Sequence, residues 1–510
     1  MRRGRLFALG LTAAFLAAES FLATRHEMWR DEVEGWLIAR DSGSIAELVR
    51  NMRYVGHPML WQVLLMPLAT LNRSPAMMQP LNLLVAGTTV LTFARFSPFT
   101  TAQKILFAFG YFSLYEYTIV CRQYGMGVLL ICLVGALFPR RYERPIWLGT
   151  VLLFLSQVSV HTVIVAISVT AGLVLDWILL RRRRSKTGLG GGRRALVGLG
   201  LSLAGVILAV VQMVPPADTG YAEGWLFRLD PTHLRDVICL INRAFLPIPN
   251  PGLHFYWEQW LDNAPLFQQA RFPVACVLLA WCVVVLLRRP VALLTYLVGT
   301  VGLLAFFYVK LLGDTNHHGF LFLIFVLALW MGRYTAAWSL RGAVDRIASV
   351  AEKTAASVLT TILVVHLAGG VLAAALETKY AFSMGKETAK FMVARGLKDA
   401  PMLGDDDYAA QTVLGYLGKD RAYYLRGARF GSFVIWNKAR TTYPGDEVLI
   451  SVAREQAREA RRDAILVMNR ELPEPLLAGD AAPAEIARFV GAAVPDENYY
   501  LYRVPAPARD

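Results

Sequence analysis

The chain begins MRRGRLFALGLTAAFLAAESFLATRHEMWRDEVEGW (residues 1–36), which joins a basic start, an apolar run and an acidic pair. The apolar run from Leu6 to Ala23 has close to the ~20 residues with which an α-helix crosses a hydrocarbon layer. A secretory signal peptide has a similar pattern. Because the polar stretch that follows carries the most chemistry in the chain, we interpret the run as an uncleaved first span.

The composition of the whole chain agrees with a membrane protein. Of its 510 residues, 55% are hydrophobic and 18% are charged, and the mean hydropathy is +0.43. Soluble domains are about a quarter charged, so these values exclude an ordinary soluble enzyme and a disordered or fibrous protein. The apolar residues form continuous runs and do not alternate as in a membrane β-barrel. The sequence therefore predicts an α-helical polytopic membrane protein.

The net charge of +14 comes largely from arginines that stand between the apolar runs. The clusters are Arg2, Arg3 and Arg5; Arg140, Arg141 and Arg144; Arg181 to Arg184 with Lys186; and Arg288 with Arg289. This pattern is typical of cytoplasmic loops under the positive-inside rule and argues against nucleic acid as a partner. The five cysteines form no CxxC pair or Cys/His cluster, which argues against thiolate-bound zinc and a disulfide framework.

Hydropathy predicts about eleven transmembrane helices. We expect them at 6–24, 76–94, 103–119, 123–139, 145–160, 163–180, 195–214, 271–287, 291–311, 319–337 and 355–376. The further apolar segment 57–71 would reach only roughly 22 Å as a helix and contains Pro67. If it crossed the membrane, the clusters at 140–144 and 181–186 would face outward. We therefore expect it to lie at the outer interface or to re-enter, with the N-terminus inside and the C-terminus outside.

This topology predicts two domains. Residues 1–377 would form a transmembrane module with outer loops at 25–75 and 215–270, and residues 378–510 a small extracytoplasmic α/β domain. In that domain we expect helices at 387–397, 409–417, 451–462 and 485–490, and strands at 401–403, 432–436, 464–468 and 499–504. It has no GxGxxG or P-loop motif. The GLGGG within 181–194 follows an arginine cluster and not a strand, so we expect a flexible cytoplasmic loop there.

The first outer loop holds the strongest candidates for chemistry. Within HEMWRDEVEGWLIAR (26–40), apolar residues at helical spacing predict an amphipathic helix at the membrane surface. These residues are Trp29, Val33, Trp36 and Leu37. Asp31 and Glu32 stand at the start of that helix. Such carboxylates either stabilise the helix through its dipole and Arg30, or one of them deprotonates an acceptor hydroxyl. The residues alone leave both interpretations open.

Further polar residues are predicted at the outer ends of the spans. They are His57, Glu116, Arg122, Tyr124, His161, Lys310, His317 and His318. Ionisable groups near a membrane core are costly and often functional. A lone histidine at a span end is also often a packed residue, Lys310 can snorkel, and Arg122 can contact lipid headgroups. Their common side favours a site whose carboxylates and cations hold a lipid-borne phosphate and a transferable group.

In their order and spacing, these features resemble the GT-C superfamily of membrane glycosyltransferases, of the protein O-mannosyltransferase and lipid A aminoarabinose transferase type. The resemblance covers about residues 1–140. It rests on the basic-flanked first span, the Asp31–Glu32 pair, the HPML segment at 57–60, and Glu116, Arg122 and Tyr124 in YEYTIVCRQYG (115–125). It implies the GT-C fold with interfacial helices, a polyprenyl-phosphate-linked sugar as donor, and an extracytoplasmic active site, here expected to face the periplasm from a bacterial inner membrane.

The resemblance also implies roles for single residues. Asp31 is expected to be the catalytic base of an inverting displacement, with Glu32 supporting it or taking that role. Arg122 and His57 are expected on the side of the donor phosphate. Sidedness alone adds Lys310, His317 and His318 as phosphate ligands. It also adds Glu116, Tyr124 and His161 as substrate-binding residues.

Two departures from the family pattern bear on cofactors. The chain has His57-Pro58-Met59 where relatives often carry HPP, and no acidic residue follows Arg122 in RQYGMG. The sequence requires no cofactor, although the acidic pair and the histidines are compatible with a divalent metal ion. The expected partners are the lipid-linked donor, a glycan, lipid or protein acceptor, and membrane lipids.

Two other functions fit parts of the sequence. A transporter or flippase for a lipid-linked or anionic solute would predict repeated halves and polar residues at the bilayer midplane, and we find neither pattern. A glycan polymerase or ligase would use a diphosphate donor. Its large outer loop would be 215–270, which contains Arg228, Arg235 and Arg243.

Overall fold

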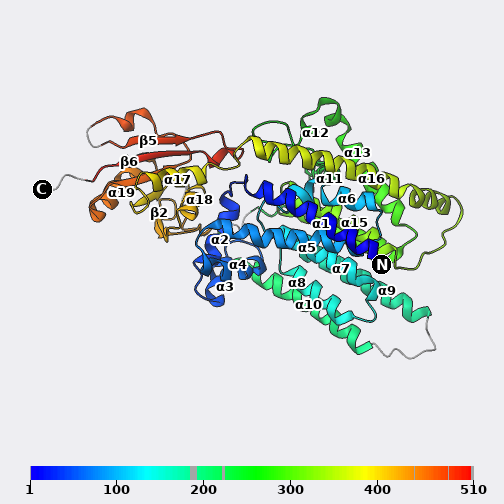
Figure 1. Cartoon of the computed structure of the whole chain (residues 1–510). Coiled ribbons are helices and arrows are strands. Elements are labelled where there is room, and N and C mark those ends of the chain that lie inside the picture. The colour runs from blue at the N-terminus through cyan, green and yellow to red at the C-terminus, as the bar shows by residue number, and fades with distance from the viewer. Residues whose placement is uncertain (1, 184–191, 221–223, 441–442, 480–481, 507–510) are drawn as a thin grey trace.

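The computed structural model describes residues 2–183, 192–220, 224–440, 443–479 and 482–506. Most of the predicted glycine-rich loop, 184–191, lies outside them. Figure 1 shows a bundle of helices followed by a smaller domain that contains a sheet. We call the end of the bundle beside this domain the domain end, and the opposite end, where the chain begins, the basic end.

Apolar runs form the bundle helices much as predicted. The helices are α1 (Arg2–Ala23), α5 (Met78–Phe96), α6 (Thr101–Ala108), α7 (Tyr124–Leu137), α8 (Pro145–Ser156), α9 (Val160–Arg183), α10 (Gly192–Met213), α11 (Pro231–Phe245), α12 (Trp260–Asn263), α13 (Pro265–Leu286), α14 (Pro290–Val309), α15 (Thr315–Gly332) and α16 (Gly342–Lys379). Among the described residues, 8 helices are long and apolar enough to cross a membrane, where hydropathy predicted about eleven spans. The helices α6, α7 and α8, at three of the predicted spans, are shorter. The protein is therefore an integral membrane protein.

Some spans differ from the prediction in length. The span expected at 103–119 is divided into α6 and a π-helical turn, Phe112–Glu116. Such turns widen a helix locally and are frequent at functional sites. The helix α16 begins at Gly342, well before the expected 355, and α15 is buried almost throughout. A helix that is apolar all round is typical of a bundle centre.

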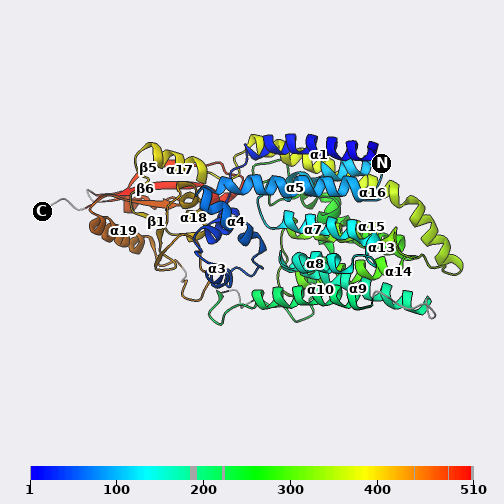
Figure 2. The same ribbon diagram turned by 60° about the horizontal axis from the view of Figure 1, so that its bottom comes forward.

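The first outer loop folds into three short helices at the domain end (Figure 2). These are α2 (Arg30–Arg40), α3 (Ile45–Met52) and α4 (Leu60–Leu71). The short segment 57–71, which was difficult to place from hydropathy, provides α4. Its buried residues Trp61 and Leu65 belong to the same hydrophobic core as Val33 and Trp36 of α2. This packing agrees with the interfacial placement.

The second outer loop, expected at 215–270, is more structured than a surface loop. Its helix α11 packs against α13 and α15. The apolar face of α11 is buried in the main core of the bundle through Val237, Leu240, Ile241 and Ala244. The sequence did not predict this buried helix within the loop, because the amphipathic pattern of α11 is shorter than a span.

The C-terminal part is a six-stranded sheet with helices, which confirms the predicted α/β domain. The strands are β1 (Met402–Gly404), β2 (Ala422–Tyr424), β3 (Arg429–Gly431), β4 (Ala464–Met468), β5 (Ala484–Phe489) and β6 (Tyr499–Val504), in the order β3-β2-β1-β4-β6-β5. The helices are α17 (Gly385–Ala394), α18 (Asp407–Leu417) and α19 (Asp446–Ala460). The strand β1 is parallel to β2 and β4, and the remaining pairs are antiparallel.

Two local expectations for this domain were wrong. The apolar run 432–436 forms a loop and no strand, and Val434 N–H donates to the side chain of Gln411. Residues 485–490, expected as a helix, lie largely within the edge strand β5. There, pairing with β6 outweighs the helical preference of the local sequence.

The domain packs directly on the first outer loop. Val33 and Leu37 of α2 share one hydrophobic core with Ala410 and Val413 of α18. Gly415 of α18 lies so close that an added Cβ would be 2.4 Å from a methyl group of Val33. The C-terminal domain therefore fixes the position of the helix that carries Asp31.

Candidate active site

A cavity of about 160 Å³ lies at the domain end, between the first outer loop and the C-terminal domain. Its polar lining consists of Asp31, Glu34, His57, Gln62, Arg122 and Gln123. Trp61 and Trp436 contribute aromatic walls. Three residues predicted from the sequence, Asp31, His57 and Arg122, therefore meet around one space.

Glu32 determines how α2 begins. Its Oε2 accepts hydrogen bonds from the backbone N–H of Trp29 (3.2 Å), as a capping-box glutamate does, and from Nε2 of His26 (2.9 Å). Its Oε1 accepts from the backbone N–H of Cys121 at 2.6 Å. Glu32 is fully buried by these contacts and does not line the cavity. Of the acidic pair, only Asp31 reaches it.

A buried histidine also holds Glu32 in place at the start of α2. His26 lies between two carboxylates, with Nε2 on Glu32 and Nδ1 2.8 Å from Oε1 of Glu377. Burial by itself lowers the pKa of His26, but the charges and hydrogen bonds of Glu32 and Glu377 raise it well above its ordinary value. A cationic His26 therefore joins α1, α2 and α16 at the domain end.

Arg122 and Asp31 form an ion pair in the cavity. Nη1 of Arg122 lies 3.2 Å from Oδ2 of Asp31, and Nε of Arg30 lies 3.6 Å from Oδ1. The bond from Cys121 N–H to Glu32 holds the neighbouring Arg122 beside α2. Nε of Arg122 is buried without a hydrogen-bond partner among the described residues. The arginine thus keeps one donor for a further anion.

Glu34 is a second carboxyl in the cavity. It stands three residues after Asp31, on the same face of α2. Its Oε1 accepts a hydrogen bond of 3.0 Å from the indole N–H of Trp436. Burial, and then the negative charge of Asp31, raise the pKa of Glu34 to about 7. Glu34 therefore exchanges a proton near neutral pH, where a carboxyl in water is ionised.

His57 lines the cavity beside these groups. Burial, and then the positive charge of Arg122, lower its pKa to about 4. Its Nδ1 is buried without a hydrogen-bond partner among the described residues. His57 is therefore neutral at pH 7, where the sequence suggested a cation.

A layer of aromatic and histidine side chains lies behind Arg122. The Arg122 guanidinium is 5.1 Å from the ring centroid of Tyr124, and the Tyr124 hydroxyl is 2.8 Å from Nε2 of His317. The ring of His161 stacks on that of His317 with centroids 4.8 Å apart. Tyr124, His161 and His317 thus form one group next to the cavity, although they do not line it.

Three other predicted residues contact different groups. Nε2 of His318 is 2.9 Å from the carbonyl oxygen of Leu312, and Nζ of Lys310 lies 5.1 Å from the centroid of the Trp225 ring. Glu116 accepts hydrogen bonds from the hydroxyls of Tyr111 (2.9 Å) and Tyr256 (3.3 Å). All three lie at the domain end, but the structure does not bring them into the cavity.

Sequence reasoning missed Glu34, Gln62 and Trp436. The spacing of Glu34 from Asp31 on a predicted helix was a usable signal, because residues three apart share a face. Gln62 lies within the predicted segment 57–71, five residues after His57. Nothing in the local sequence linked Trp436 to the first loop, because the contact joins two domains.

An ion pair fixes the loop that carries Trp436 to the start of α18. Arg440 binds Asp407 at the start of α18 at 2.7 Å, and its guanidinium lies 4.7 Å from the centroid of the Trp436 ring. The ring of Tyr408 stacks on the ring of Trp436, with the two centroids 6.3 Å apart. Arg30 of α2 contacts Asp496. The domain is therefore joined to α2 by the Arg30–Asp496 ion pair and by the hydrogen bond from Trp436 to Glu34.

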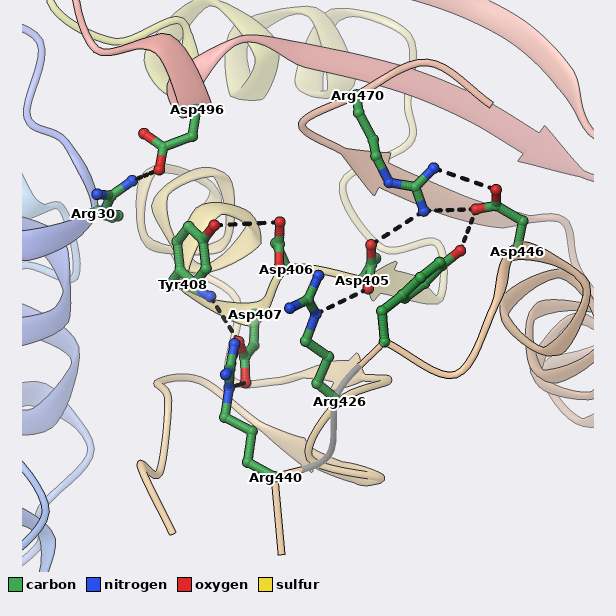
Figure 3. A network of polar contacts seen from close by, with 11 residues as sticks. Arg30, Asp405, Asp406, Asp407, Tyr408, Arg426, Arg440, Asp446, Arg470 and Asp496 are labelled. Atoms are coloured by element: carbon green, nitrogen blue, oxygen red, sulfur yellow. Dashed lines mark hydrogen bonds and ion pairs between the residues drawn. The ribbon is translucent and has the colours of Figure 1, made fainter. Parts of the chain in front are cut away.

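The same network extends into the sheet domain. Arg426 binds Asp406 at 2.7 Å and Asp405 at 3.2 Å, and Arg470 binds Asp446 at 2.6 Å and Asp405 at 3.3 Å. These pairs neutralise the acidic run that follows β1 (Figure 3). Among the residues that the structure describes, no group of three or more His, Cys, Asp or Glu side chains is arranged to hold a metal ion.

Comparisons with known proteins agree with this architecture. No protein-family model and no curated protein sequence matches the chain. The chain is similar to the crystal structure of ArnT from Cupriavidus metallidurans bound to undecaprenyl phosphate, with a TM-score of 0.50 and 13% identity over 99% of each chain. The apo structure of the same protein also gives a TM-score of 0.50 and 13% identity, over 98% of this chain and 100% of the other. The chain therefore has the fold of these ArnT structures.

Proposed function

We propose that this protein is a membrane glycosyltransferase that moves a sugar from a polyprenyl-phosphate donor to an acceptor. The observation that carries the proposal is the ion pair of Asp31 and Arg122 in a cavity at the domain end. A carboxylate beside a cation suits a reaction in which a hydroxyl loses a proton while a phosphate gains charge.

The reaction that fits this arrangement is a single displacement. Asp31 takes the proton of the acceptor hydroxyl as its oxygen forms a bond to the anomeric carbon. The bond from that carbon to the phosphate oxygen breaks, and its electron pair leaves with the polyprenyl phosphate. Because attack and departure occur on opposite faces, the anomeric centre inverts. Arg122, with its unpartnered Nε, neutralises the leaving phosphate.

The chemistry of the donor is supported by the fold neighbour, which binds undecaprenyl phosphate. Residues near the cavity supply groups for a phosphate and a sugar. They include the orphaned Nδ1 of His57, the amide of Gln62, and the ring of Trp436. Because Arg122 supplies the charge that the leaving group needs, the proposed reaction requires no metal ion.

The orientation follows from charge. The clusters at Arg140, Arg144, Arg288 and Arg289 adjoin helix ends away from the C-terminal domain. The positive-inside rule places that end in the cytoplasm and the cavity on the extracytoplasmic side, as in a bacterial inner membrane facing the periplasm. The acceptor is then a glycan, lipid or protein that reaches the outer surface.

A donor competition with the purified full-length protein tests the proposal. We expect release of polyprenyl phosphate from a polyprenyl-phosphate sugar in the presence of an acceptor extract, and persistence of this release after chelation of divalent ions. Excess undecaprenyl phosphate should inhibit more strongly than undecaprenyl diphosphate. Preference for the diphosphate would indicate a polymerase or ligase. Lipid flux into liposomes without sugar transfer would indicate a flippase, and either result contradicts the proposal.

A further inference from the structure

A second cavity, of about 310 Å³, lies at the basic end of the bundle and has no part in the proposed reaction. Four cations line it: Arg288, Arg289, Arg333 and Lys353. Glu352 is the single carboxylate in the lining. Apolar side chains of α13 and α15, including Val285, Leu286 and Leu329, form the remaining wall. The cavity thus combines an excess of positive charge with an apolar surface.

Arg288, Arg289 and Glu352 connect the segments around the cavity, and we call these three residues the frame. Glu352 of α16 lies 3.3 Å from Nη1 of Arg288 and 3.4 Å from Nε of Arg289. Nη1 of Arg289 donates to the carbonyl oxygen of Thr335 at 2.7 Å, and Nε of Arg288 lies 3.3 Å from Asp345. The turn between α13 and α14 is therefore fixed to α16 and to the segment after α15.

The other two cations are not used by this frame. Arg333 and Lys353 are exposed and have no ion pair with a carboxylate of the described residues. Guanidinium and ammonium groups beside a cavity bind phosphate oxygens through charge-assisted hydrogen bonds. Arg333 and Lys353 therefore give the cavity two cationic groups that are available to bind a phosphate.

The surface around the cavity indicates that the ligand arrives from the membrane. On the first turns of α16, Val344, Ile347 and Val350 are spaced by three residues and are 51%, 59% and 61% exposed. Trp338 and Tyr334, just before α16, are also exposed. An apolar helical stripe next to exposed Trp and Tyr is typical of a segment that lies at the headgroup level of a bilayer.

We propose that this cavity binds the phosphate of an anionic phospholipid, such as phosphatidylglycerol, with its acyl chains along the apolar wall. Arg333 and Lys353 hold the phosphate, while Arg288, Arg289 and Glu352 keep the cavity open. Basic pockets between transmembrane helices on the cytoplasmic side bind acidic lipid headgroups in this way. Because the lipid contacts α13, α15 and α16 together, it stabilises the folded bundle.

Thermal unfolding of the full chain in detergent tests this proposal. The protein is titrated with phosphatidylglycerol, phosphatidylcholine or inorganic phosphate, and an apparent affinity is derived from the rise in Tm. The test variant is Arg333→Gln/Lys353→Gln. The matched control is Arg140→Gln/Arg144→Gln, which removes two exposed positive charges near the same end of the bundle without touching the cavity.

We expect wild type and control to bind phosphatidylglycerol more tightly than phosphatidylcholine, and the test variant to bind phosphatidylglycerol about 30-fold more weakly. Equal weakening in the control would assign the effect to general surface charge and overturn the proposal. An equal response to phosphatidylcholine, or to inorganic phosphate at the same concentration, would also overturn the assignment to an anionic lipid.

Discussion

Oε1 of Glu34 accepts a hydrogen bond of 3.0 Å from the indole N–H of Trp436, although 402 residues separate the two in the chain. The bond joins the helix that carries Asp31 to a loop of the C-terminal domain. The domain thereby forms part of the cavity wall and is more than a cover attached to the bundle.

We therefore expect a replacement of Trp436 to affect catalysis as well as domain stability. We expect Trp436→Ala to lower kcat/KM about 10- to 100-fold, because a wall of the cavity and a hydrogen bond to a carboxyl group are lost. Trp436→Phe, which keeps a ring, should lose less. Phe430→Ala removes an exposed ring of the same domain and serves as the control. Wild-type kinetics in the Trp436→Ala variant would exclude this residue from the site.

The raised pKa of Glu34 predicts a pH-dependent stability. The folded protein keeps this proton up to about pH 7, whereas the unfolded chain loses it near the ordinary value of 4.5. The contribution of Glu34 to stability is therefore complete below about pH 4.5 and decreases as the pH rises to about 7. We expect the Tm of wild type to fall across this range relative to that of Glu34→Gln. Parallel curves for the two proteins, with exposed Glu387→Gln as the reference, would contradict this assignment.

Arg122 is expected to act on the leaving phosphate. Arg122→Gln should reduce kcat about 100- to 1000-fold, the range found when one preorganised donor to a developing anion is removed. Arg122→Lys keeps the charge but not the geometry and should recover only part of the activity. Arg458→Gln, on the exposed face of α19, is the control. If Arg122→Gln raised only the KM for the acceptor, Arg122 would contact the acceptor and not the leaving phosphate, which would contradict this role.

Glu32 is expected to be structural. Glu32→Gln weakens three buried hydrogen bonds, to Trp29, His26 and Cys121. We expect a loss of about 3 kcal/mol in the free energy of unfolding, because a buried charged partner of His26 is removed. The activity per folded molecule should stay above that of Asp31→Asn. A Glu32→Gln protein that is as stable as wild type but inactive would contradict the structural role and indicate a catalytic one.

The fold was largely predictable from the sequence because spans and arginine clusters are local signals. Leu6 to Ala23 indicates α1 by length and composition alone, and the apolar segment 57–71 indicates the short helix α4. The helix α11 was missed because its apolar face is too short for a span. The strand β5 was missed because its pairing with β6 is not encoded locally.

The site was predictable only in part. Asp31, His57 and Arg122 were identified because their residue types stand out at the ends of apolar runs. Lys310 and Glu116 had the same signal but contact Trp225, Tyr111 and Tyr256 instead. The predicted side of the membrane tells only at which end of the bundle a residue lies. The packing of the helices determines which side chains are in contact. The Trp436 contact depends on how two domains pack, and no local pattern contains that information.

The central claim is that Asp31 removes the proton from the acceptor. The most direct measurement is the rate of sugar transfer from a polyprenyl-phosphate donor by Asp31→Asn, compared with Asp399→Asn, which changes an exposed residue of the C-terminal domain. Asn keeps the shape of the side chain but cannot accept the proton as a carboxylate does. We expect Asp31→Asn to lose at least about 100-fold in kcat while the protein remains folded, and Asp399→Asn to match wild type. Full transfer activity in a folded Asp31→Asn protein would contradict the account.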